Sequence, residues 1–112
     1  MRLRNLTTGR VVAANVTRAG TPWTRLRGML LPEAMDDDAG IWLADCWLIH
    51  TLGARLPLDV LFLDAIERVV RVAPHVRRGR VLWCRGARTV VALSAGAIAR
   101  NDVLAGDRLA LA

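Results

Sequence analysis

The 112-residue chain contains no lysine and only two cysteines, Cys46 and Cys84. Two cysteines far apart in the sequence are too few for a disulfide framework, so we expect both to be small, reduced core residues. No stretch approaches the roughly 18 uninterrupted apolar residues of a membrane helix, and the N-terminus lacks the apolar segment of a signal peptide. We therefore expect a soluble cytoplasmic protein that does not associate with membranes.

Because lysine is absent, all 16 basic residues are arginines, and the formal net charge is +6. This composition is typical of a GC-rich genome, and it favours weak association with acidic surfaces at low salt. The arginines are scattered except for Arg77, Arg78 and Arg80, and no aromatic stacking platforms are interleaved with that cluster. We therefore expect no specific nucleic acid binding. Docking of the basic loop on an acidic partner is a further hypothesis.

Internal repeats, linkers and low-complexity segments are also absent, and 54% of the residues are hydrophobic. A chain of this length and composition buries a core large enough to fold without disulfides. We expect one domain over residues 1–112.

Short apolar runs separated by Gly, Pro and Asp turns dominate the chain and predict strands. Two helices are predicted: one over 18–31, with Thr21 as N-cap and Pro22 at its first position, and one over 95–100, ended by Asn101. We expect Pro74 to end the strand that precedes it. The predicted fold is a β-dominated α+β domain, a small antiparallel sheet curled into a barrel or partly closed barrel with one or two short helices. The predicted strands cover residues 3–6, 11–16, 41–43, 58–63, 68–73, 81–84, 89–93 and 108–111.

The order of these elements resembles that of a known protein family. Residues 19–111 carry motifs that resemble the DUF192 (UPF0127) family of small, mostly prokaryotic proteins. The most specific of them is Pro57, Leu58 and Asp59 followed by an apolar strand. The resemblance implies a compact β-rich domain, and it adds no chemistry because the family has no assigned activity. The motifs are TPWTRLRGML, AGIWLA, RLPLDVLFLD, RVVRV followed by Pro, TVVALSAG and AGDRLAL.

The sequence departs from the common family pattern at two places. An aromatic, Met, Lys, Asn, Thr run often precedes the Pro, Leu, Asp element, whereas this chain has a different turn over residues 50–54, HTLGA. The usual Glu of the strand before the Ala, Gly pair corresponds to Ala92. If that Glu and the aspartate of the Pro, Leu, Asp element form a carboxylate pair in other members, this chain lacks the pair, so we do not expect it to share an acid–base mechanism.

The stretch from 46 to 64 gathers the candidate functional residues. Asp59 begins a run that should be buried, and burying a carboxylate without partners is costly. We predict that His50, Thr51, Arg55 and Asp59 form one polar network at the mouth of the sheet. That network is either structural, holding the turn, or a site for a small polar or anionic ligand or a protein partner, with Trp47 or Trp83 as an apolar wall.

An enzyme is the alternative hypothesis. A hydrolase or transferase would use Cys46 or His50 together with Asp59, provided that the turn folds back to bring them together. Cys46, His50, His75 and Cys84 are also ligand types that zinc accepts, but the close Cys or His pairs of structural zinc sites are missing. We therefore expect no metal and no other cofactor.

Overall fold

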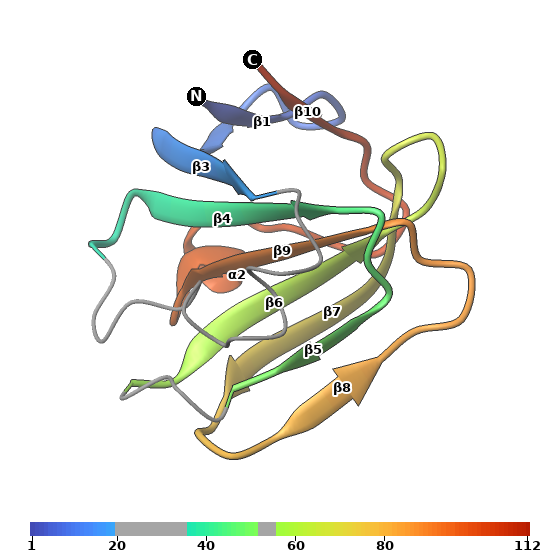
Figure 1. Ribbon diagram of the computed structural model, residues 1–112. Coiled ribbons are helices and arrows are strands. Elements are labelled where there is room, and N and C mark those ends of the chain that lie inside the picture. Colours follow the sequence, from blue (N-terminus) through green and yellow to red (C-terminus); the bar gives the residue numbers. More distant parts are fainter. Residues whose placement is uncertain (20–35, 52–55) are drawn as a thin grey trace.

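The structure is a computed structural model, and it describes residues 1–19, 36–51 and 56–112. Ten described strands and one short helix, α2, make up the fold (Figure 1). Their bounds are β1 Leu3–Asn5, β2 Val11–Ala13, β3 Asn15–Ala19, β4 Ala39–Ala44, β5 Leu48–His50, β6 Leu58–Leu63, β7 Val69–Val76, β8 Val81–Trp83, β9 Thr89–Ser94, α2 Ala97–Arg100 and β10 Leu109–Leu111.

A five-stranded sheet with the order β3-β4-β9-β6-β7 forms the middle of the molecule. Its strands β6 and β9 are buried at every position, because both faces of the sheet are covered. This explains why β6 is a continuous apolar run rather than an alternating one, and its bounds are those that the sequence predicts. Asp59 lies inside this run.

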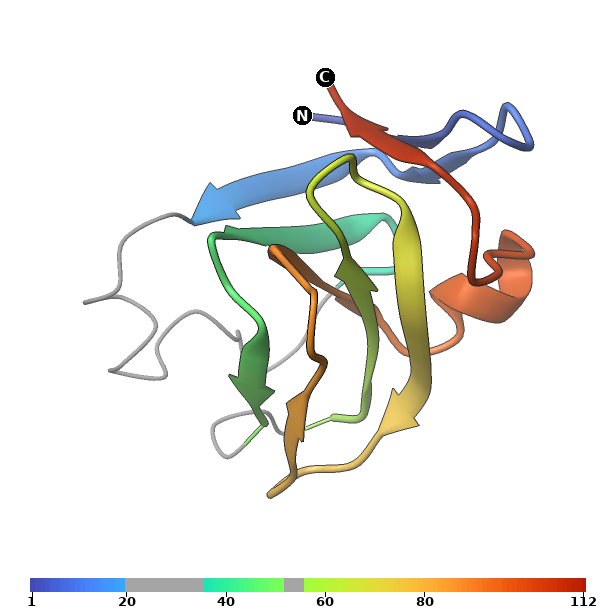
Figure 2. The same cartoon turned by 90° about the vertical axis from the view of Figure 1, so that its right-hand side faces the viewer.

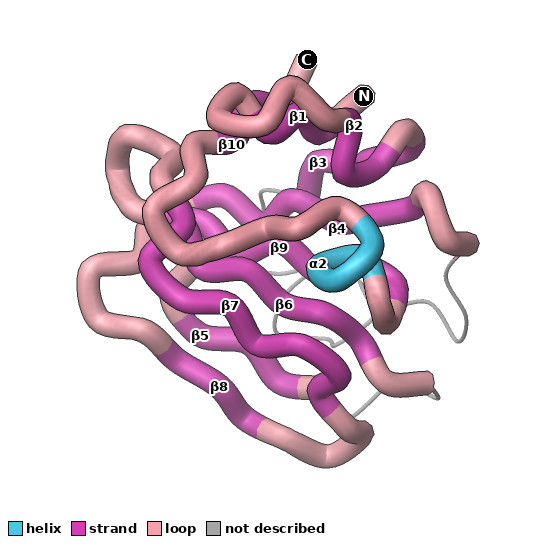
Figure 3. The backbone as a smooth tube through the Cα atoms, turned by 180° about the vertical axis from the view of Figure 1, so that it is seen from behind, coloured by secondary structure: helices cyan, strands magenta, loops and turns pink. Residues whose placement is uncertain are grey.

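Two hydrophobic cores lie on opposite faces of the central sheet. Leu61 and Leu63 of β6 pack in a core with α2 and the strands near the termini, whereas Leu58, Val60 and Phe62 pack in a second core with β5. The alternation follows from the period of two along a strand. Figure 3 shows α2 lying across one face of the sheet, and Figure 1 shows β5 and β8 on the other side.

The chain ends meet in a separate three-stranded sheet with the order β10-β1-β2. Arg2 and Ala112 exchange two backbone hydrogen bonds of 2.7 and 2.9 Å, which places the termini side by side (Figure 2). The third sheet is the two-stranded ribbon of β5 and β8, in which Leu48 pairs with Trp83 and His50 with Val81. The described residues thus form three layers.

The β-dominated fold is confirmed, but the predicted barrel is wrong. All three sheets formed by the described residues are open. The chain covers its central sheet with two small sheets, so both faces are buried without closing the central sheet on itself. The expected all-antiparallel pairing also fails at one place, since β3 and β4 are parallel.

Three local predictions need correction. The expected strand 11–16 splits at Ala14, so that β2 and β3 belong to different sheets. Pro74 does not end its strand, since β7 continues to Val76. A missing N–H is tolerated there because β7 is an edge strand and is bulged opposite Asp59. β5 was not predicted, and its strand conformation comes from pairing with β8.

The helix predictions have different outcomes. The expected helix over 95–100 is present as α2, and the backbone N–H of Asn101 closes its end on Ala97. Most of the expected helix over 18–31, including Thr21 and Pro22, lies outside the described residues. Arg18, its first residue, belongs to β3.

Candidate functional site

Asp59 is almost completely buried, with 1% of its surface exposed, and both of its carboxylate oxygens accept backbone hydrogen bonds. The His75 N–H donates to Oδ1 at 2.8 Å. The N–H groups of Gly96 and Ile98 donate to Oδ2 at 3.1 and 2.8 Å. Gly96 is the N-cap of α2 and has no side chain to cap it, so the Asp59 carboxylate supplies the cap from β6. Asp59 therefore joins α2 and the bulge of β7 to β6 within the central sheet.

The Asp59 contacts also account for an unusual backbone conformation. His75 has φ +54°, in the left-handed region, and sits in the β7 bulge. Bulges re-aim side chains at the edges of sheets. The hydrogen bond from the His75 N–H to Asp59 holds this bulge, and the His75 side chain is exposed on the outer edge of the sheet.

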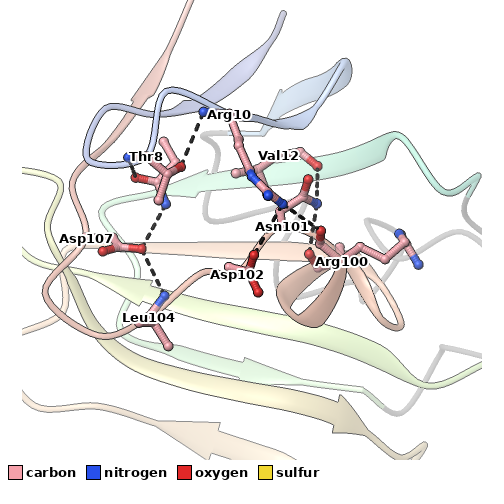
Figure 4. Close-up of polar contacts among 10 residues, drawn as sticks. Thr8, Arg10, Val12, Arg100, Asn101, Asp102, Leu104 and Asp107 are labelled. Atoms are coloured by element: carbon pink, nitrogen blue, oxygen red, sulfur yellow. Dashed lines mark hydrogen bonds and ion pairs between the residues drawn. The ribbon is translucent and has the colours of Figure 1, made fainter.

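A second motif of the family resemblance has the same structural character. Asp107, which follows Gly106, accepts hydrogen bonds from the Asn5 side-chain amide at 2.9 Å and from the Leu104 N–H at 3.0 Å. Figure 4 shows this cluster beside an exposed ion pair of 3.3 Å between Arg10 and Asp102. Asn5 is fully buried, so its contact with Asp107 ties β1 to the turn before β10. The recognisable aspartates of the family thus hold the fold together.

Thr51 holds the basic turn that joins β7 to β8. Its hydroxyl donates to the Arg77 carbonyl at 2.7 Å and accepts from the Arg80 N–H at 3.0 Å. Its backbone N–H donates to the Arg80 carbonyl, and the Gly79 N–H donates to the Thr51 carbonyl. Thr51 has no exposed surface. It is therefore a positioning residue, which fixes the conformation of residues 77–80.

A cleft of about 350 Å³ opens between β7 and β8, next to this turn. We call it the β7–β8 cleft. The two strands are consecutive in the chain but belong to different sheets, and their divergence forms the cleft. Arg71 bridges them farther along, since its guanidinium donates to the Trp83 carbonyl at 2.8 Å. The lining residues are Ala73, Pro74, His75, Val76, Arg77, Arg80, Val81 and Leu82.

The chain around the cleft carries charge of one sign. Residues 68–101 contain eight arginines and no acidic residue. Hydrogen bonds from this segment reach the carboxylate of Asp59, which is buried and engaged by three N–H groups, and that of Asp64, which accepts from the Arg68 N–H at the start of the segment. The lining of the cleft therefore combines basic residues, His75, Arg77 and Arg80, with apolar ones.

The structure separates the members of the predicted network. His50 and Thr51 lie on the ribbon side of the central sheet. Asp59 shares the opposite face of the sheet with Leu61 and Leu63, where it contacts the start of α2. Trp47 is 54% exposed and precedes β5. Arg55 lies outside the described residues, so its place in the network stays a prediction.

His50 itself is half-buried at the end of β5. Its Nδ1 atom is buried and has no hydrogen-bond partner within residues 1–19, 36–51 and 56–112. His50 and Asp59 do not meet, because they belong to opposite faces of the sheet. The contacts of Asp59 thus give no support to a pairing with His50.

The two cysteines are free, and both pack against the core on the ribbon side. The Cys46 thiol donates to the Leu48 carbonyl at 2.9 Å, so it is engaged by its own loop. The described part of the chain contains no group of three His, Cys, Asp or Glu side chains that could hold a metal ion. No helix in that part is long and apolar enough to cross a membrane.

Another cleft, of about 230 Å³, lies where β4 ends near the β6–β7 turn. Its lining mixes charges of both signs, so it favours no single class of ligand. The lining residues are Arg18, Trp42, Ala44, Asp45, Asp64, Ala65, Glu67, Arg88 and Thr89.

The described fold and clefts define a small, three-layered, β-dominated domain with a basic cleft between two of its sheets. The chain belongs to the DUF192 family, described as "Uncharacterized ACR", whose model matches residues 4–111. This confirms the resemblance seen in the sequence. A search of curated proteins finds no match.

Two solved structures share the fold. A presumed transcription regulator from Sinorhizobium meliloti 1021 is 25% identical, with a TM-score of 0.81 over 97% of this chain and 89% of that one. A protein of unknown function from Novosphingobium aromaticivorans DSM 12444 is 20% identical, with a TM-score of 0.83 over 99% of this chain and 84% of that one. The similarity therefore extends over nearly the whole chain in both cases.

Sequence reasoning missed His75 and the part that Arg77 and Arg80 take in a cleft. The cluster of arginines was visible as a basic loop, but the cleft depends on β7 and β8 belonging to different sheets. The sequence did contain a signal. Residues 68–101 lack acidic residues, which is typical of a segment that contacts anions or acidic surfaces.

Proposed function

We propose that this protein is a binding module that holds a small anionic ligand, bearing a phosphate or carboxylate group, in the β7–β8 cleft. The observation that carries the proposal is the convergence of His75, Arg77 and Arg80 on one cleft with an apolar wall. A volume of about 350 Å³ is at the lower end of the range of small-molecule sites. Arginine donates two parallel hydrogen bonds to such oxyanions, which adds geometric selectivity to charge.

Preorganisation supports the same proposal. The main chain of the turn is held by the Thr51 hydroxyl, and the bulge at His75 is held by Asp59. The cleft therefore keeps its shape without a ligand, which lowers the entropic cost of binding. Of the residues predicted from the sequence, Thr51 and Asp59 act in this proposal by positioning, and neither touches the ligand.

Hydrolase or transferase activity is not proposed. Such an enzyme would use Cys46 or His50 together with Asp59. Asp59 instead bonds to backbone N–H groups, and the Cys46 thiol bonds to the Leu48 carbonyl. The regulator function in the name of the S. meliloti protein is not carried over either. The helix in the described residues, α2, has four residues, which is too short to fill a major groove.

Calorimetric titration with inorganic phosphate, pyrophosphate and citrate tests the proposal. Arg80→Ala should weaken binding of the best of these anions by about tenfold, the effect of one charged hydrogen bond of roughly 1.4 kcal/mol. Arg78→Ala is the matched control, since Arg78 belongs to the same turn but does not line the cleft. It should change the affinity by less than about twofold.

Two results would contradict the proposal. Equal losses for Arg78→Ala and Arg80→Ala would show that the anions respond to net charge and not to the cleft. Absence of binding heat for all three anions at millimolar concentration, in a protein that unfolds at its normal temperature, would remove the cleft as an anion site.

A further inference from the structure

The outer face of the β5–β8 ribbon presents a block of apolar side chains to solvent. Leu48 and Trp83 are direct partners, as are His50 and Val81, so these four side chains share one face. Their neighbours Ile49 and Leu82 pack against the core on the other face. Leu48, Val81 and Trp83 are 41%, 52% and 57% exposed. The block is therefore contiguous rather than a set of scattered apolar residues.

The ends of this block are cationic. Arg80 immediately precedes β8, and Arg85 follows it after one residue. Arg77 and Arg78 belong to the turn before Arg80, and all four arginines are exposed. Acidic residues are missing from the whole segment of 68–101. The face thus combines an apolar centre with a positive rim.

We infer that the outer face of the ribbon is a docking surface for an acidic segment of a partner protein. Its composition is that of the centre of a protein interface, where Trp and Arg are enriched and Lys, Asp and Glu are depleted. The occupant is argued from charge complementarity: apolar side chains would cover Leu48 and Trp83, and carboxylates would face Arg80 and Arg85.

The aliphatic residues of the face favour an acidic peptide over a single-stranded nucleic acid as the occupant. Bases need a series of aromatic platforms, and Leu48 and Val81 offer none. The inference does not depend on the proposed anion site, because Leu48 and Trp83 do not line the β7–β8 cleft. The two surfaces share Arg80, but substitutions at Leu48 and Trp83 affect the docking surface alone.

The test uses the full chain as bait for a displayed library of random twelve-residue peptides. We expect the selected peptides to be enriched in Asp and Glu next to apolar residues. Their affinity should fall at least about tenfold in a Leu48→Thr/Trp83→Thr double variant, as expected for loss of an interface hot spot. It should also fall as salt rises from 50 to 300 mM, because the rim is exposed.

The control variant is Leu104→Ser, which removes an equally exposed apolar residue, 65% exposed, outside the ribbon. It should leave peptide affinity unchanged. Threonine in the double variant keeps the β-propensity of the strands, and thermal unfolding checks that the ribbon survives. The same double variant should bind phosphate as the parent protein does, whereas Arg80→Ala should weaken phosphate binding by about tenfold, so failure of one site is distinguished from failure of the other.

Three results would overturn the inference. Selected peptides without acidic residues, or with equal affinity for the double variant, would show that the ribbon face is not the docking surface. Tighter Trp83-dependent binding of fluorescein-labelled dT20 or of phosphatidylserine vesicles would assign the face to a nucleic acid or a lipid surface. Self-association that the double variant abolishes, seen by sedimentation, would make a second copy of the chain the occupant.

Discussion

The buried carboxylate of Asp59 holds elements of the fold together. Three N–H donors converge on its two oxygens from β7 and from the start of α2. Hydrogen bonds to a charged group are stronger than those between neutral groups, so the desolvation cost of the carboxylate is offset. Asp59 therefore connects residues that are 16 and 39 positions away in the sequence.

Replacing Asp59 by Asn should lower the free energy of unfolding by about 2–4 kcal/mol, because the new amide group faces an N–H donor that it cannot accept from. Urea denaturation of the purified variant measures the loss. Asp36→Asn, at an exposed position, is the matched control and should stay within about 0.5 kcal/mol of the parent protein. A similar stability of Asp59→Asn and Asp36→Asn would contradict the structural role.

The sequence leaves three roles for Asp59, which must point outward, be paired or line a site, and its hydrogen bonds show that it is paired. Sequence reasoning could not choose the partners, because they are backbone groups. His75 and Ile98 donate through atoms that every residue other than proline possesses, so no side-chain type signals the contact. The predicted partner His50 was chosen by sequence proximity, and β6 turns Asp59 away from it.

At the scale of elements, β4 is packed so closely between its neighbours that one position accepts no side chain. A Cβ atom added at Gly40 would lie 2.9 Å from Cδ2 of Leu93, on β9, and 3.4 Å from Cγ2 of Val16, on β3. Leu93 has no exposed surface and so has little room to move. The close packing of β4 against β9 therefore depends on glycine at this position.

Gly40→Ala should cost about 1–3 kcal/mol of unfolding free energy through overpacking. Leu93→Val removes the atom in closest contact, so the double variant should lose less than the sum of the two single losses. Chemical denaturation of the four proteins gives this coupling energy, expected at about 0.5–3 kcal/mol. Strictly additive losses would show that the contact between residues 40 and 93 is not what limits the packing.

The elements that were predicted correctly are those whose conformation follows from their own local sequence pattern. β6 and β9 were found because buried strands are continuous apolar runs. β5 was missed because its strand conformation comes from pairing with β8. Ile49 and Leu82, which are partners in this pairing, are 33 residues apart in the chain. The β7–β8 cleft was missed for the same reason, because the local sequence does not show which sheet each strand joins.

At the scale of the whole molecule, positive charge and structural carboxylates are divided between different regions. Asp59 and Asp107 are buried and hold elements together, whereas seven of the eight arginines in residues 68–101 lie between residues 68 and 88, along β7, the turn to β8 and the connection to β9. Because acidic residues are missing from 68–101, the local field along this segment would favour anions or acidic partners near the ribbon. Both proposed surfaces lie in that field, one beside β8 and one on its outer face.

The three layers should unfold together, because β6 and β9 supply side chains to both cores. We expect urea unfolding to show one transition, with equal midpoints for far-UV circular dichroism and tryptophan fluorescence. The signals report different regions, since Trp83 lies on the ribbon and Trp42 in the core on the side of α2. A Trp83→Phe variant isolates the ribbon contribution. An earlier midpoint for the Trp83-dependent signal would mean that the ribbon unfolds independently, and the prediction of one domain over residues 1–112 would then fail.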